Sequence, residues 1–370
     1  MKERVVRGRV SALVAGVAAV TLALSGCGSK KANNGGTAGS GTTGGSSSGS
    51  AAAIKACMVT DTGGIDDKSF NASAYAGLKQ AASEGKATVP QPLESKTETD
   101  YKTNINNLLG QNCKVILTVG GLMGAATKAA AEANPKQKFV EVDNPGNGTN
   151  WKGLQFDAAQ GGFLGGYLAA GYSKTGVVAT YGGLQIPPVT VYMDGFWEGV
   201  QYYNQQKNKS VKVLGWNEAT QKGTFGGGFV DQNKGKSLTT NFIAQNADVI
   251  FPVAGGLGLG SAGVAQSTKK AVVIWVDTDG YVSAPQYKDV FLSTVFKDVK
   301  GAVHTAISDE AAGNDTTKDY VGTLANNGTG LSPFHDFDAK VDTGLKAELD
   351  KIKQEIVAGK ITMKSKASPK

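Results

Sequence analysis

The sequence predicts an α/β protein with two lobes, each a parallel β-sheet with helices on both faces. Three observations support this fold class. Short β-branched runs alternate with helical stretches from residue 54 onward. This alternation starts again near residue 155, which indicates a second lobe. With 40% apolar residues in a chain of 370, there is enough hydrophobic material for two such cores.

The elements follow one another with short connections. The first strand is the short run IKACMVT, which contains β-branched residues, and a helix-like stretch, SFNASAYAGLKQAASEG, follows it. Because strands alternate with helices, neighbouring strands are expected to be parallel. The first series is strand 54–60, helix 69–85, strand 87–94, helix 100–112, strand 114–120, helix 125–135, strand 138–143, strand 153–157 and helix 158–174. The second is strand 176–183, helix 191–206, strand 211–216, helix 234–246, strand 248–256, helix 261–270 and strand 271–277, followed by strand 290–297 and helices 299–313 and 342–358.

The N-terminus has the pattern of an export signal. A basic segment precedes the uncharged apolar run at 10–24, which is short for a membrane span. The residues Leu24-Ser25-Gly26-Cys27 resemble the lipobox of bacterial lipoproteins. The resemblance implies a signal peptide at 1–26, cleavage before Cys27 and lipid on its thiol, which anchors the protein to the outer face of the cell membrane. The alternative is an uncleaved signal-anchor helix. Residues 28–53 are a Gly/Ser-rich tether.

The net charge of +7 belongs mostly to the leader and the tether. Residues 1–26 have four basic residues against one acidic, and residues 27–53 add two lysines. Residues 54–370 therefore keep only +2, with 32 basic and 30 acidic residues. A basic surface that binds nucleic acid is not expected on this body.

Two cysteines remain for the body, Cys57 in the first strand and Cys113 at the start of the strand 114–120. In a doubly wound sheet these strands are neighbours, so a disulfide is geometrically feasible in an oxidising compartment. The alternative is two free thiols in the core. With two histidines in the chain, we expect no metal site and no cofactor.

Candidate ligand contacts lie where strands end, because open α/β sheets bind ligands outside the carboxyl ends of their strands. Glycines there allow close approach of the backbone, and carboxylates accept hydrogen bonds from ligand donors. The segments selected by this rule are Asp61-Thr62-Gly63-Gly64, Gly120-Gly121, Asp143-Asn144, Gly182-Gly183, Trp216-Asn217, Gly255-Gly256 and Asp277.

Two patterns raise the alternative of an exported enzyme on the same scaffold. Residues 258–263 match G-x-G-x-x-G, but in the third strand–helix unit of the second lobe rather than the first. Two S-x-x-K matches lie near predicted helix ends, without the partner motifs of acyl-serine enzymes. Because no nucleophile and base pair can be assembled from the sequence, we expect a binding protein and not an enzyme.

The segment after the first strand, DTGGIDDKSFN at 61–71, combines carboxylates, an amide and an aromatic ring at the start of a helix. Capping by Asp66, Asp67 or Ser69 is the simplest explanation, but capping does not require the glycines, Phe70 and Asn71 together. This signature, with the lipobox, resembles the basic membrane lipoproteins, whose best-known members are purine-nucleoside receptors of ABC importers. The likeness covers about residues 54–360 and includes FLGGYLAA at 163–170, GVVATYGG at 176–183 and FVDQNKGK at 229–236.

The resemblance implies a type I periplasmic-binding-protein fold, with two lobes joined by a hinge that close on a small ligand. One lobe is expected to hold 54–153 with about 281–325, and the other 154–280 with about 326–360. Asp61 and Asn71 would bond the edge of a nucleobase and Phe70 would stack on it, while Trp216, Phe225 or Phe229 would cover its other face. Asp277 and Lys297 would meet ribose hydroxyls beside Gly256. The full set of expected ligand-binding residues is Asp61, Asp67, Phe70, Asn71, Gly121, Asp143, Trp216, Phe229, Gly256, Asp277 and Lys297.

The chain departs from the family pattern at two positions. Ala125 stands where relatives often have an acidic residue, and Gln160 where they usually have Glu. The first change removes an expected ribose contact, so a receptor for another small solute, such as a sugar or a signalling molecule, stays an alternative. The resemblance implies a nucleoside ligand, an ABC permease as partner and a monomeric receptor.

Overall fold

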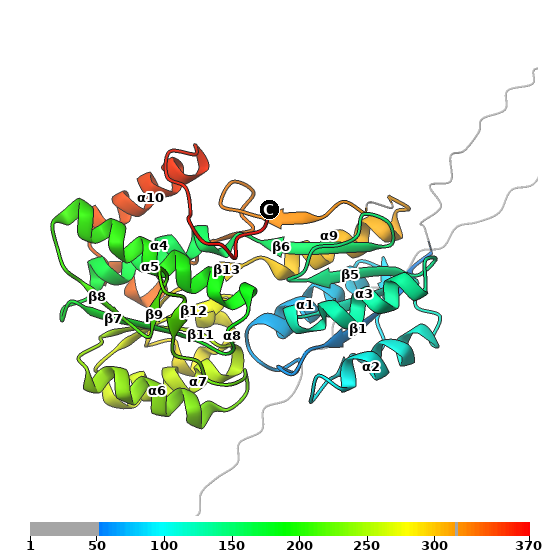
Figure 1. Ribbon diagram of the computed structural model, residues 1–370, viewed down its shortest axis with the longest axis horizontal. Coiled ribbons are helices and arrows are strands. Elements are labelled where there is room, and N and C mark those ends of the chain that lie inside the picture. The colour runs from blue at the N-terminus through cyan, green and yellow to red at the C-terminus, as the bar shows by residue number, and fades with distance from the viewer. Residues whose placement is uncertain (1–51, 315–316) are drawn as a thin grey trace, which may run out of the picture. The chain divides into compact units, whose positions relative to one another are not determined.

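The computed structural model describes residues 52–314 and 317–370, all of them within one compact unit. The predicted signal peptide, the lipid site Cys27 and nearly all of the predicted tether lie in residues 1–51, outside the described part. Two β-sheets organise the unit, and each has helices on both faces (Figure 1), which confirms the predicted fold class.

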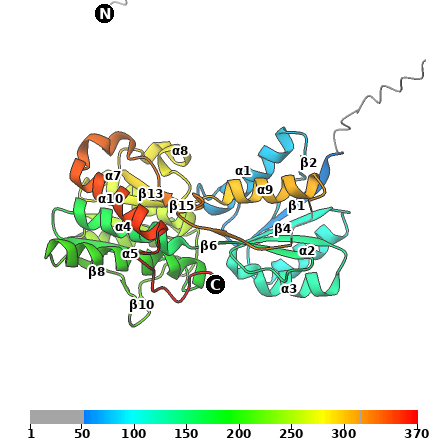
Figure 2. The same cartoon turned by 90° about the horizontal axis from the view of Figure 1, so that it is seen from above.

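In the first sheet all the pairs are parallel, in the order β14-β6-β5-β4-β1-β2, and β3 also pairs with β1. Alternate residues of β1 face opposite sides. Ala56 and Met58 pack with α1 and α9, and Cys57 and Val59 pack with α2 and α3. Figure 2 shows these helix pairs on opposite faces of the sheet. The elements of this lobe are β1 (Ile54–Thr60), α1 (Phe70–Ser83), β2 (Ala87–Thr88), β3 (Leu93–Glu94), α2 (Asp100–Leu109), β4 (Val115–Val119), η1 (Gly121–Met123), α3 (Gly124–Ala133), β5 (Lys138–Val142), β6 (Trp151–Phe156), α9 (Val299–Ala311) and β14 (Tyr320–Gly322).

The second sheet repeats this order as β15-β13-β12-β11-β7-β8, with β15 as an antiparallel edge strand. Helices α4, α5 and α10 cover one face, and α6 and α7 pack against the other. Its elements are α4 (Ala158–Tyr172), β7 (Val177–Gly182), α5 (Pro187–Lys207), β8 (Lys212–Leu214), the hairpin β9 (Trp216–Asn217) and β10 (Lys222–Gly223), α6 (Gln232–Ala244), β11 (Val249–Val253), η2 (Gly255–Gly258), α7 (Leu259–Thr268), β12 (Val272–Asp277), α8 (Gly280–Ser283), η3 (Pro285–Tyr287), β13 (Phe291–Lys297), β15 (Thr329–Leu331), η4 (His335–Lys340) and α10 (Thr343–Val357).

Within the described residues the chain crosses between the sheets three times, after β6, after β13 and between β14 and β15. The predicted lobe boundaries are wrong in two places. Residues 154–156 belong to the first sheet, because they complete β6. Residues 281–297 belong to the second lobe, because β13 pairs with β12 and β15.

Proline explains two smaller differences from the predicted elements. Pro90 and Pro92 interrupt the strand predicted at 87–94, which becomes the separate short strands β2 and β3. The helix predicted from residue 191 begins earlier, at Pro187, where proline suits the first turn. The hairpin β9–β10 and the short strands β14 and β15 had no clear sequence signal.

Cys57 in β1 and Cys113 just before β4 form a disulfide, with their Cα atoms 5.9 Å apart. This settles the choice that the sequence left open. The strand register itself places Ile116 opposite Cys57, and Cys113 reaches Cys57 from the connection between α2 and β4, two residues before β4 begins. The bridge lies in the core shared with α2 and α3.

Glycines bring α4 and α5 into close contact. A Cβ atom on Gly166 of α4 would lie 1.9 Å from the carbonyl oxygen of Phe196, and one on Gly199 of α5 would lie 2.0 Å from that of Phe163. Such distances leave no room for any side chain, so the helix backbones touch directly. The GG pair in FLGGYLAA is therefore a packing feature of the second lobe.

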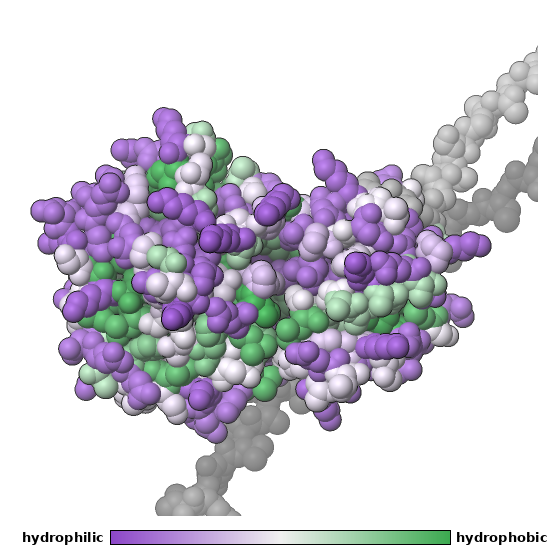
Figure 3. Space-filling view, viewed as in Figure 1, coloured by the Kyte–Doolittle hydropathy of each residue, from purple (hydrophilic) through white to green (hydrophobic). Residues whose placement is uncertain are grey.

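The face drawn in Figure 3 has hydrophilic side chains over most of its outline and a band of hydrophobic residues across its middle. In the part of the chain that the structure describes, no helix combines the length and the apolar character needed to cross a bilayer.

Candidate functional site

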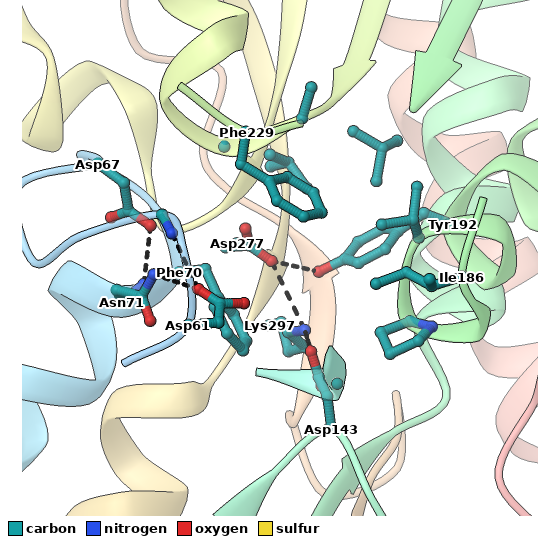
Figure 4. A pocket seen from close by; sticks show the side chains of 18 residues that line it. Asp61, Asp67, Phe70, Asn71, Asp143, Ile186, Tyr192, Phe229, Asp277 and Lys297 are labelled. Atoms are coloured by element: carbon teal, nitrogen blue, oxygen red, sulfur yellow. Dashed lines mark hydrogen bonds and ion pairs between the residues drawn. The ribbon is translucent and has the colours of Figure 1, made fainter. Parts of the chain in front are cut away.

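A pocket lies where the carboxyl ends of the two sheets meet, as the strand-end rule predicts. It contains about 520 Å³ of empty space, part of which opens to solvent. The first lobe contributes residues that follow β1, β4 and β5. The second contributes residues that follow β7 and β10 and residues at the ends of β11, β12 and β13 (Figure 4). Nine of the eleven expected residues line it: Asp61, Asp67, Phe70, Asn71, Gly121, Asp143, Phe229, Asp277 and Lys297.

The start of α1 is held by Asp67. Its Oδ1 accepts hydrogen bonds from the backbone N–H groups of Ser69 and Ala72, both at 3.0 Å, and its Oδ2 accepts one from that of Asn71 at 2.8 Å. Both carboxylate oxygens therefore satisfy N–H groups that the first helical turn leaves unpaired. Asp67 borders the pocket, but its hydrogen bonds are those of a helix cap.

Asp61 and Asn71 form a buried pair at one end of the pocket. Asp61 Oδ1 accepts from Asn71 Nδ2 at 3.0 Å and from the backbone N–H of Gly63 at 3.1 Å. Among the described residues, no group donates to the buried Asn71 Oδ1. Burial raises the pKa of Asp61 to about 6, although its two hydrogen bonds oppose the shift. The pair thus offers a carboxylate and an amide oxygen to donors of a ligand.

A lysine between two aspartates forms another part of the pocket. Lys297, only 3% exposed, places Nζ at 3.0 and 2.9 Å from the two carboxylate oxygens of Asp143 and at 3.8 Å from Asp277 Oδ1. Burial raises the pKa of the Asp143 carboxyl, and the charge of Lys297 opposes that shift. Asp143 and Asp277 have φ angles of 76° and 66°, a left-handed conformation that costs energy outside glycine. In this conformation both carboxylates, at the ends of β5 and β12, face the pocket.

Asp277 also accepts hydrogen bonds from both lobes. Tyr192 on α5 donates its hydroxyl to Oδ1 at 2.9 Å, and Ser69 in the β1–α1 loop donates its hydroxyl to Oδ2 at 2.7 Å. Figure 4 shows the Tyr192 hydroxyl, Asp277 and Lys297 meeting in the middle of the pocket. These contacts fix the orientation of the Asp277 carboxylate.

Phe70 and Phe229 bring two half-buried aromatic rings to the same pocket, one from each lobe. Phe70 begins α1, and its ring centroid is 4.4 Å from Nζ of Lys297, within cation–π range. Phe229 follows a run of three glycines, and its ring lies over Gly183, where a Cβ atom would be 2.4 Å from the ring. Glycine at 183 therefore makes room for the ring.

Comparison with known proteins decides the family. Residues 54–366 match the family described as ABC transporter substrate-binding protein, PnrA-like. This chain belongs to that family. It is 32% identical to the ABC transporter nucleoside-binding protein BmpA of Lactococcus lactis subsp. cremoris, over 99% of this chain and 100% of that protein. It is 29% identical to basic membrane protein A of Borreliella burgdorferi, over 84% of this chain and 88% of that protein.

Solved structures show the same fold. A solute-binding protein of an ABC transporter system from Aeropyrum pernix K1 has a TM-score of 0.76 at 23% identity, over 84% of this chain and 92% of that chain. The arabinose-binding protein AraP of Geobacillus stearothermophilus has a TM-score of 0.57 at 15% identity, over 78% of this chain and 99% of that chain. The fold is thus that of periplasmic binding proteins. The PnrA-like chain is an extracytoplasmic substrate-binding protein of an ABC importer, and not an enzyme.

Two of the expected ligand residues lie outside the pocket lining. Trp216 is a core residue, 3% exposed, whose Nε1 donates to Asp194 Oδ1 at 2.9 Å. It forms a T-shaped pair with Phe225, their ring centroids 5.9 Å apart, so of the three aromatic candidates only Phe229 lines the pocket. Gly256 is also absent from the pocket lining, whereas its neighbour Gly255 belongs to it.

The two departures from the family pattern also lie outside the pocket. Ala125 is exposed on α3 and is not among the residues that line the pocket. Gln160 donates to Asp157 Oδ2 at 2.8 Å and accepts from the backbone N–H of Leu324 at 2.9 Å. It therefore joins two of the segments that cross between the sheets.

Sequence reasoning missed the contribution of the segment after β7. Ile186, Pro188, Val189 and Tyr192 line the pocket, and the predicted helix began too late to include most of them. The signal was the pair Pro187-Pro188 a few residues after a strand end, since proline favours the first turn of a helix.

Proposed function

We propose that the pocket binds a nucleoside and holds its base between Phe70 and Phe229. One observation carries the proposal: two aromatic rings from opposite lobes share a pocket with a buried carboxylate and amide pair, Asp61 and Asn71. Rings of this kind bind the flat face of a base, and the polar pair matches the donors on its edge. The name of the Lactococcus relative supports a nucleoside as ligand.

The sugar of the nucleoside would occupy the end lined by Asp143, Asp277 and Lys297. The two carboxylates accept hydrogen bonds from vicinal hydroxyls of the sugar, and the ammonium group of the lysine donates to the hydroxyl oxygens. Four aspartates line the pocket against this one lysine. We expect this excess of negative charge to disfavour a phosphate, so a nucleoside fits better than a nucleotide.

The mechanism in this proposal is closure of the two lobes around the ligand, with movement at the three segments that cross between the sheets. A ligand that contacts residues of both lobes binds the closed state better and shifts the population toward it. The closed, monomeric receptor then delivers the nucleoside to its ABC permease.

A thermal-shift screen tests the ligand. Adenosine, guanosine, adenine, ribose and AMP are each added to the chain from Ser50 onward, which contains the whole compact unit. A ligand at 100 times its Kd adds about 2.7 kcal/mol of stability. We expect a shift for the nucleosides and none for AMP or ribose; a shift for ribose alone indicates a sugar receptor instead.

The Phe229→Ala substitution tests stacking. It should weaken nucleoside binding by about 1–3 kcal/mol, the usual contribution of one base–aromatic contact. Phe225→Ala is the matched control, because this ring lies on the same loop but outside the pocket lining. Equal losses of affinity in calorimetric titrations of the two variants would contradict the stacking role.

We also propose that lipid on Cys27 anchors the receptor to the membrane through the tether. The support is the Leu24-Ser25-Gly26-Cys27 motif after an apolar run. Cys27→Ser should release the protein from membranes on fractionation, whereas Ser29→Ala should not. A Cys27→Ser protein that stays in the membrane fraction and keeps its leader would show a signal-anchor helix.

A further inference from the structure

We propose that Ser69 is a positioning residue that holds the two lobes together around the ligand by its hydrogen bond to Asp277. The inference rests on lobe closure as part of the proposed function, but not on the identity of the ligand. Ser69 belongs to the β1–α1 loop of the first lobe, and Asp277 ends β12 of the second. The bond between Ser69 Oγ and Asp277 Oδ2, 2.7 Å long, therefore joins the two lobes beside the pocket.

The Ser69 hydroxyl has no role in capping the helix that follows it. Its side chain makes no cap hydrogen bond, because Asp67 already accepts from the first free N–H groups of α1. The hydroxyl instead points to the second lobe, where it also lies 3.3 Å from the carbonyl oxygen of Val276. Its structural partner is thus the opposite lobe rather than its own helix.

The acceptor, Asp277, is also oriented by a hydrogen bond within the second lobe. The Tyr192 hydroxyl holds the other oxygen of Asp277, Oδ1, at 2.9 Å, and this fixes the plane of the carboxylate before the lobes meet. Ser69 itself is 0% exposed, so the bond forms where water is excluded. A hydrogen bond to a charged group in such surroundings is stronger than one on the surface.

The second link between the lobes differs in kind. Lys297 and Asp143 also pair across the pocket, but both line it and so compete with ligand groups for each other. Ser69 is absent from the pocket lining, although its acceptor Asp277 belongs to it. The Ser69 hydroxyl therefore competes with no ligand group, and its bond to Oδ2 of Asp277 stabilises the closed state with any ligand that leaves this bond in place.

Ser69→Ala tests this role. The variant should release adenosine about tenfold faster, since a hydrogen bond to a charged group contributes at least about one factor of ten. Association should change little, because the open state lacks the bond. The matched control is Ser73→Ala, in the first turn of α1 and outside the pocket lining, which should keep the wild-type release rate. Release is followed by stopped-flow fluorescence after thermal unfolding has shown that each variant is folded.

Two further comparisons separate positioning from loss of structure and from the choice of ligand. Ser69→Thr keeps a hydroxyl and Ser69→Val has the same shape without it, so slow release by Thr and fast release by Val are expected. Small-angle scattering of the ligand-free proteins should show a larger radius of gyration for Ser69→Ala than for wild type. If wild type fails to bind adenosine, the nucleoside proposal fails and the scattering result still decides this one. Unchanged scattering, or equal release rates for Thr and Val, overturns it.

Discussion

Asp61→Asn should make the ligand-free protein more stable and a poorer receptor. Asp61 is 6% exposed, and burial raises the pKa of its carboxyl from 3.8 to about 6. Asparagine has the same shape and keeps an acceptor oxygen for the N–H groups of Asn71 and Gly63, but it carries no charge that must lose its hydration. The substitution therefore removes the cost of burying the Asp61 carboxylate, a group that is needed for ligand binding and not for folding.

The size of the effect follows from the shift in pKa. Above pH 6 the Asp61 carboxyl is ionised in both the folded and the unfolded chain, and the difference of about two pKa units costs the folded state about 3 kcal/mol. The cost falls as the pH drops from 6 to 3.8, because the folded state takes up a proton first. With an unfolding entropy of about 2.1 cal/mol/K per residue over 52–370, the gain corresponds to about 5 °C in Tm.

Urea denaturation, followed by tryptophan fluorescence at pH 7.5 and pH 4, measures this directly. We expect Asp61→Asn to gain about 3 kcal/mol at pH 7.5 and less than about 1 kcal/mol at pH 4. Asp66→Asn, with a side chain 85% exposed, is the control and should stay within about 0.5 kcal/mol of wild type. Adenosine affinity of the wild type should also fall below pH 6, as Asp61 is protonated. A variant that is less stable than wild type at pH 7.5 would refute the reasoning.

Two further predictions concern the scaffold. Gly166→Ala should lower the free energy of unfolding by about 1–3 kcal/mol, because the added Cβ has no space between α4 and α5. Gly263→Ala is the control and should be neutral or stabilising, because its Cβ would meet its nearest atom at 3.7 Å; equal urea midpoints for the two variants would contradict the packing argument. Replacing Cys57 and Cys113 together by Ala should lower the free energy of unfolding by about 4 kcal/mol, the loop-closure value for a separation of 56 residues. As a control, a reductant should lower the Tm of the wild type but not that of the double variant.

The sequence was most informative where local pattern and topology agree. Asp61 after β1 and Asp277 at the end of β12 were predicted to contact ligand because the carboxyl ends of parallel strands meet at one edge. Trp216 was misplaced because an aromatic residue after a strand has the same local pattern whether it faces the core or the pocket. Trp216 lies in β9 and faces the core, whereas Phe229, which follows the β9–β10 hairpin, lines the pocket.

The lobe boundaries failed for a similar reason. Nothing in the local sequence of β13 shows which sheet it joins. The strand follows elements of the second lobe and precedes α9 of the first, so its place in the chain is compatible with either sheet. The glycines Gly165 and Gly166 of α4 had no local explanation, since the residues they pack against, Val295 on β13 and Phe196 on α5, lie on other elements. The inter-lobe bond of Ser69 is likewise invisible in sequence, where the residue has the pattern of an ordinary helix cap.

The central claim is that one pocket recognises a base and a sugar together. Calorimetric titration of the chain from Ser50 onward with adenosine, adenine and ribose in parallel tests it most directly. The account predicts one adenosine site per chain, with adenine and ribose each at least about tenfold weaker, because each engages only one end of the pocket. Ribose that binds as tightly as adenosine, or adenosine that does not bind, would contradict it.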